Sequence, residues 1–206
     1  MDKWDEIESR MESLGIKESE LIEKFTLDNV GKSAAVFNEE KLVWLNSWYI
    51  RNDPPEKIAG LVLPLLKEKG IDAEVDEKLI KIVKELSQRA KTLLDITSSI
   101  DYFYADEITY DETAAGKFLT PEIKSVLEEF RDKLLGLSDF NMDEMHKVFD
   151  KIMEERELKL GKIAQPLRVA LTGGTVSPGI FEVMDILGKD EVLKRLNNAI
   201  DAIPSQ

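Results

Sequence analysis

The segment from Leu167 to Leu196 constrains the fold most strongly, because apolar helical runs alternate in it with residues that stop helices. The run Leu167–Leu171 is typical of the end of a buried helix. Thr172, Gly173 and Gly174 follow it, and glycine tolerates the left-handed backbone that ends many helices. The sequence therefore predicts that a helix ends here and that a turn over 172–179 begins.

A second and a third helix are predicted after this turn. Ser177 can cap the free N–H groups of the second helix, and Pro178 suits its first position, where a missing N–H costs nothing. Gly188 ends that helix, and Asp190 can cap the third one. Apolar residues at helical spacing predict that one face of the second helix is buried: Ile180, Val183, Met184 and Leu187.

The rest of the chain has the same helical period, and no segment has the alternation of a strand system. Helices are predicted over 2–14, 18–25, 38–51, 54–69, within 76–105, and near 112–118, 120–136, 141–157 and 162–172. The segment 25–37 is predicted to be irregular. In the helix 38–51, Asn38 can act as the cap, and one side carries Leu42, Leu45, Trp48 and Tyr49. The fold class is therefore predicted to be all-α, with helical bundles packed end to end.

Two polar breaks divide this helical chain. Asn52-Asp53-Pro54-Pro55 interrupts the pattern because proline cannot continue a helix, and Asp106–Thr113 is acidic and polar. The predicted organisation is a short helical part over 1–53, followed by two consecutive helical-bundle domains over 54–105 and 106–206.

The charge is acidic overall but uneven. The formal net charge is −13, which argues against a general attraction to nucleic acid. Lys81, Lys84, Arg89 and Lys91 nevertheless lie close together along the chain with Glu85 alone among them, and 159–181 holds three cations and no acid. Two interpretations stay open: local cationic contacts with a ligand, or ordinary solvated helix faces.

Composition favours a non-catalytic chain in a reducing compartment. There is no cysteine and no long apolar run, so we expect a cytoplasmic protein without membrane contact. Thr172-Gly-Gly-Thr175 lacks the Lys-Ser/Thr of a phosphate loop, and the single histidine, His146, is typical of a surface helix position. No nucleophile-plus-base pair is visible. No catalytic residue and no metal site is therefore predicted.

Three landmarks resemble a known family. The stretch Glu40–Arg51 (EKLVWLNSWYIR) is similar to a conserved stretch of bacterial glutamyl-tRNA synthetases, class I glutamate–tRNA ligases. Gln88–Leu93, followed by Tyr102-Phe-Tyr104, resembles the family's next landmark. Gly161–Gly174 and Ser177–Phe181 resemble its C-terminal signature, in which a threonine stands where this chain has Ser177.

The resemblance covers only the C-terminal portion of that family. It implies that 1–53 is the end of a stem-contacting region and that 54–105 and 106–206 are two α-helical anticodon-binding domains, a so-called α-helical cage. The catalytic domain, with its His-x-Gly-His and Lys-x-Ser-Lys motifs, does not occur in this sequence. ATP and Mg²⁺ are therefore implied for the parent enzyme and not for this chain, which we expect to be inactive alone.

The resemblance also implies the binding residues. Arg89 corresponds to the arginine that reads the third anticodon base, and Arg168 and Ile180 to residues around the first base. Ser177, Pro178 and Phe181 correspond to the turn that holds the middle base. The implied partners are the anticodon loop of the tRNA for glutamate and the parent's catalytic domain, with no DNA, and the chain is expected to be a monomer. An acidic, all-helical protein-interaction module without RNA binding is the alternative.

Overall fold

The computed structural model describes Glu23 and residues 37–204, and every regular element within them is an α-helix. The all-α prediction is therefore confirmed. The predicted helices 2–14 and 18–25 and the irregular segment 25–37 lie, apart from Glu23, outside the described residues. Across the described ranges, none of the helices is long and apolar enough to cross a membrane. The helices from Glu39 onward belong to one structural unit.

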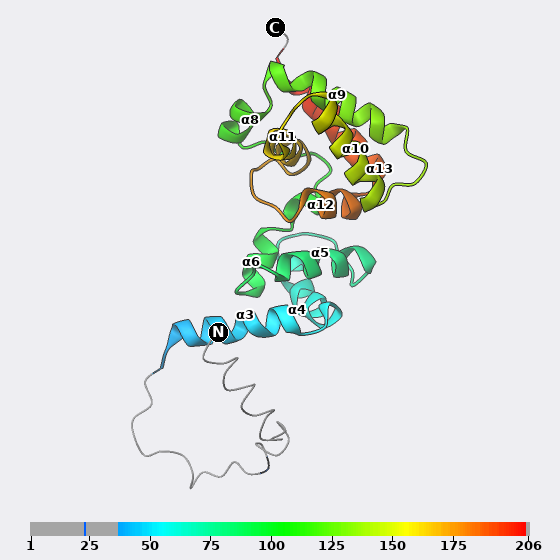
Figure 1. The fold of residues 1–206 in the computed structure, drawn as a ribbon. Helices are drawn as coiled ribbons and strands as arrows, with labels where there is room; N and C mark the ends of the chain where they lie inside the picture. Colours follow the sequence, from blue (N-terminus) through cyan, green and yellow to red (C-terminus); the bar gives the residue numbers. More distant parts are fainter. Residues whose placement is uncertain (1–22, 24–36, 205–206) are drawn as a thin grey trace. The chain divides into compact units, whose positions relative to one another are not determined.

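The first helices of this unit pack around α5 (Figure 1). Helix α4 contacts α5 and α6, and α3 contacts α5. Proline breaks the chain between α3 and α4, as predicted, because Pro54 and Pro55 cannot extend a helix but can begin one. The bounds are Glu39–Asn52 for α3, Pro55–Glu68 for α4, Glu77–Ser87 for α5, Leu93–Ser98 for α6 and Asp101–Tyr104 for α7.

The remaining helices pack around α9, α11 and α13 (Figure 1). Phe130 of α9 and Phe149 of α10 are fully buried and meet edge to face, with ring centroids 5.9 Å apart. Helix α12 contacts α10, α11 and α13, and it also contacts α5 of the first group. The bounds are Glu112–Phe118 for α8, Pro121–Leu135 for α9, Met142–Glu155 for α10, Leu160–Thr172 for α11, Ile180–Leu187 for α12 and Lys189–Ala202 for α13.

Several helix starts follow from local side-chain chemistry. Asn141 caps α10 by accepting a hydrogen bond from the Glu144 N–H. Asp111 caps α8 in the same way, and Thr92 and Asp95 form a reciprocal capping box on α6. The helices predicted near 112–118, 120–136, 141–157 and 162–172 are thus confirmed within a few residues at each end.

Two predicted caps are wrong. Helix α12 begins at Ile180 with Gly179 as its N-cap, and Ser177 does not cap it, because the Ser177 hydroxyl donates to the Pro178 carbonyl instead. Helix α13 follows Gly188 directly, so Asp190 lies inside its first turn. A carboxylate there still favours the helix through its dipole.

Helix α3 leaves most of its apolar side uncovered. Leu42, Leu45 and Tyr49 are 52%, 41% and 48% exposed, whereas Ser47 and Ile50 are buried. Of the apolar side chains grouped by spacing, Trp48 is half-buried and the other three are exposed. The division at residues 53 and 106 stays a prediction.

The turn after α11 begins with a left-handed glycine. Gly173 has φ of +80° and ends α11, as predicted. Its carbonyl accepts a 2.9 Å hydrogen bond from the Asp111 N–H, and its α-carbon lies directly against the Thr109 carbonyl. The connection between α7 and α8 therefore packs on the start of the turn.

This contact predicts that alanine destabilises the protein at Gly173 but not at the neighbouring Gly174. Gly173→Ala should lower the free energy of unfolding by more than about 1–2 kcal/mol, because alanine is strained at positive φ and its Cβ would collide with Thr109. Gly174→Ala is the matched control, since a Cβ there meets no atom within 4 Å and φ is not positive. Urea unfolding followed by circular dichroism measures both. Equal stability of the two variants would contradict the role of Gly173.

Candidate functional site

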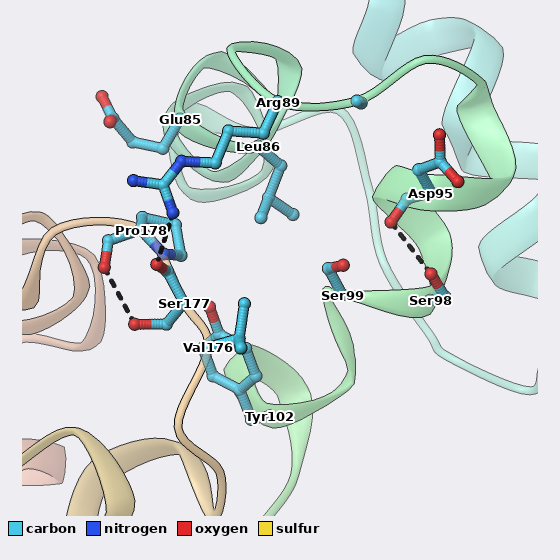
Figure 2. A pocket seen from close by; sticks show the side chains of 11 residues that line it. Glu85, Leu86, Arg89, Asp95, Ser98, Ser99, Tyr102, Val176, Ser177 and Pro178 are labelled. Carbon is cyan, nitrogen blue, oxygen red and sulfur yellow. Dashed lines mark hydrogen bonds between the residues drawn. The ribbon is translucent and has the colours of Figure 1, made fainter. Parts of the chain in front are cut away.

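A pocket of about 310 Å³ lies where the first helices meet the turn before α12. Figure 2 shows Arg89 from the end of α5 and Tyr102 from α7 approaching Val176, Ser177 and Pro178 of the turn. Distant segments therefore form one concave surface. The pocket is lined by Glu85, Leu86, Arg89, Ala90, Asp95, Ser98, Ser99, Tyr102, Val176, Ser177 and Pro178.

Arg89 reaches across this pocket from the end of α5. Its side chain donates from Nη1 to the Ser177 carbonyl oxygen at 3.2 Å, and the residue is exposed (Figure 2). No ion pair joins it to Glu85 in the described part of the chain, so packing against Glu85 does not explain its position. Because a guanidinium has five N–H donors, most of its hydrogen-bonding capacity faces the pocket and solvent.

Arg168 holds the turn from the other side. Its Nη1 donates to the Ser177 carbonyl at 3.0 Å and to the Pro178 carbonyl at 2.6 Å, and it contacts the Ser177 hydroxyl. The side chain is half-buried, and its Nε–H is buried without a partner among the described residues. Burial first, and then the nearby Arg89, lower the pKa of Arg168 below its ordinary value. Arg168 is thus a brace for the turn, and it remains a cation.

The turn is buried at its Ser177-Pro178 end and exposed at its tip. Ser177 and Pro178 are buried, as are Ile180 and Phe181, while Val176 is 82% exposed. Phe181 is stacked on the exposed His146, with ring centroids 3.6 Å apart. The apolar side chains that follow the turn therefore point into the core. Of the predicted residues, Arg89, Ser177 and Pro178 line the pocket, whereas Arg168, Ile180 and Phe181 support it from behind.

Tyr102 was missed as a pocket residue. Its hydroxyl is buried and has no hydrogen-bond partner among the described residues. The sequence marked Tyr102-Phe-Tyr104 only as a landmark, and a tyrosine between apolar residues is typical of a core. The described residues also contain no group of three or more side chains that could hold a metal ion, so no role in binding Mg²⁺ is assigned to them.

Comparison with known proteins identifies the family of this chain. Residues 57–200 match the family model of an anticodon binding domain, which covers well over half of the chain. The chain therefore belongs to the anticodon-binding domain family. Within it, the chain corresponds to the anticodon-binding portion of bacterial glutamate–tRNA ligases, as the sequence landmarks predicted.

The relatives are longer than this chain. It is 47% identical over 187 residues to the glutamate–tRNA ligase of Syntrophobacter fumaroxidans, a match covering 91% of the chain and 40% of the relative. The enzyme of Geobacter sulfurreducens is 42% identical over 181 residues, covering 88% and 39%. The solved structure of a glutamate tRNA ligase from Elizabethkingia meningosepticum has a TM-score of 0.80 at 29% identity, covering 92% and 37%. The chain thus spans about 40% of the length of the relatives it matches.

The buried tyrosines predict a loss of stability at high pH. Burial raises the pKa of Tyr104 to about 12, and burial also raises the pKa of Tyr102. Above the unfolded value of about 10, the unfolded chain loses phenol protons that the native state keeps, so the free energy of unfolding should fall as pH rises. Urea unfolding at a series of pH values above and below about 10 measures this. Tyr102→Phe should give a shallower decline, and an unchanged slope would contradict the assignment.

Proposed function

We propose that this chain binds the anticodon loop of the tRNA for glutamate at the pocket between α5 and the turn 173–178. The observation that carries the proposal is the convergence of Arg89 and Arg168 on one carbonyl oxygen, that of Ser177, at the rim of the pocket. Two cations so close together in a chain of net charge −13 favour a ligand with negative charge or many acceptors. A single-stranded loop offers both, in its phosphates and in the edges of its unpaired bases.

The chemistry of Arg89 favours one base over another. Glutamate and glutamine tRNAs differ at the third anticodon base, which is cytosine in the first and guanine in the second. On its pairing edge cytosine presents acceptors at O2 and N3, where guanine presents N–H donors at N1 and N2. Arginine has donors only, so it can satisfy cytosine but would face guanine with unpaired donors on both sides. Arg89 therefore supports discrimination for cytosine.

The supporting residues fit this proposal in a different way. Arg168 and the buried Ile180 and Phe181 hold Ser177 and Pro178 in place, so that base-binding groups need no rearrangement. Their proposed contribution to the first and middle bases is thus through the shape of the turn. Ser177 and Pro178 line the pocket and can contact the ligand directly.

In this proposal the catalytic step takes place in another domain of a larger parent enzyme. A parent glutamate–tRNA ligase would attach glutamate using ATP and Mg²⁺ in a catalytic domain, and this chain would hold the anticodon as a monomer in the cytoplasm. Residues 1–53 would be the end of the stem-contacting region, and 54–105 and 106–206 the two anticodon-binding domains.

The first test is a titration of the chain with the tRNA for glutamate and with an unrelated tRNA, at several salt concentrations. We expect tighter binding of the first, with an affinity that falls as salt rises because phosphate contacts release counterions. Fluorescence anisotropy of labelled tRNA provides the measurement. Equal, weak binding of both tRNAs would favour the alternative, an acidic protein-interaction module.

The second test changes Arg89. Glutamine can both donate and accept, so Arg89→Gln should reduce the preference for cytosine, mainly by strengthening the binding of guanine. Arg89→Ala should weaken the binding of cytosine by about 1–3 kcal/mol. Two anticodon stem-loops that differ only at the third base are compared. Arg168→Ala is the control for a bracing role: it should also lower the melting temperature, because it removes the hydrogen bonds that tie α11 to the Ser177 and Pro178 carbonyls. Wild-type protein that binds both loops equally would remove Arg89 from the site.

A further inference from the structure

A buried arginine ties together the two helical groups that form the pocket. Arg195 of α13 is only 3% exposed. Its Nε donates to the Glu191 carboxylate at 2.7 Å, its Nη1 to the Leu171 carbonyl at 2.8 Å and its Nη2 to the Ala105 carbonyl at 3.1 Å. Each of its three nitrogens therefore has a partner, and the partners come from different parts of the chain.

The two carbonyls lie at the segments that lead into the site, one at the end of α11 and the other at the end of α7. Leu171 lies in the last turn of α11, where carbonyls lack helical partners, and the turn with Ser177 starts two residues later. Ala105 ends α7 and begins the connection to α8. Arg195 thus joins the start of the turn to the start of the connection between the two groups.

Neighbouring contacts fasten the same connection. Lys194 Nζ donates to the Asp106 carbonyl at 3.0 Å, and the Asp111 N–H donates to the Gly173 carbonyl at 2.9 Å. A further cross-group contact, between Lys81 of α5 and Asp185 of α12, measures 3.2 Å and lies at the surface. Exposed ion pairs contribute little, whereas a buried charge with a partner on each of its nitrogens resists displacement.

We infer that Arg195 is a positioning residue. By donating to both the Ala105 and the Leu171 carbonyls, it fixes the position of Arg89 relative to the Ser177 turn. Arg89 reaches the turn with a single 3.2 Å bond, so a small shift of the first group would move its donors away from the ligand. Specificity for the third base, which rests on the proposed function, then depends on a residue outside the pocket. Lysine at this position would keep the charge but could not span three partners, because it has one nitrogen where arginine has a planar fork.

The first arm of the test measures geometry without any RNA. The chain has no cysteine, so pairs of cysteines can carry spin labels at chosen sites. Labels at the exposed positions Lys84 and Thr175 report the distance from α5 to the turn, and labels at Lys84 and Glu68 report a distance inside the first group. Arg195→Lys should shift or broaden the first distance distribution and leave the second unchanged. An unchanged first distribution would overturn the inference.

A matched control separates position from general loss of structure. Arg131→Lys makes the same substitution at a partly exposed arginine that bonds Asn197 within the second group, and it should leave both distances unchanged. If Arg195→Lys does not fold, Glu191→Ala removes the acceptor of Arg195 Nε and should broaden the first distribution. No change in that variant would also count against the inference.

The second arm measures binding. With the two stem-loops that differ at the third base, Arg195→Lys should reduce the cytosine-to-guanine preference at least about fivefold while the salt-dependent binding to both loops persists. A variant that keeps the full preference would overturn the role in specificity. If wild-type protein binds neither loop, the proposed function fails, while the label distances still decide whether Arg195 positions the turn.

Discussion

The arrangement of the site depends on the Ser177 carbonyl, which accepts hydrogen bonds from two arginines of different helical groups. Guanidinium groups repel each other, so a shared acceptor is needed to hold them close. Burial of the Arg168 side chain further raises the free-energy cost of keeping it charged. The backbone around Ser177 must therefore be rigid. Gly173 supplies the change of direction and Phe181 anchors the far end, and the turn is fixed between them.

Much of the helical fold follows from local sequence signals. Gly173, Asn141 and the prolines at 54 and 55 end or begin helices through their own backbone preferences, and these preferences act without the rest of the molecule. The cap expected at Ser177 fails for the opposite reason. Arg168, which only the tertiary fold brings to the turn, donates to the Ser177 hydroxyl, and the hydroxyl donates to the neighbouring Pro178 carbonyl. Local chemistry predicts an element well where nothing distant offers a better partner.

The candidate site could be predicted only in part. Sequence landmarks indicated Arg89 and the turn, but no spacing rule places Arg89 beside a residue 88 positions further along the chain. The helical spacing predicted the burial of Ile180 but not that of Phe181, because a single apolar residue at a helix start fits an exposed position and a core alike. The pairing of Arg195 with two distant carbonyls likewise depends on how α13 crosses the end of α11.

The unpartnered Arg168 Nε–H and Tyr102 hydroxyl show that the free chain is locally frustrated beside its pocket. Ser87, Tyr104 and Gln165 carry further buried atoms without a partner among the described residues, but Tyr102 lines the pocket and Arg168 braces its rim. A buried donor without a partner costs free energy. Under the proposed function, a ligand acceptor that reached either group would recover that cost, so part of the binding free energy would come from groups that the free chain leaves unpaired.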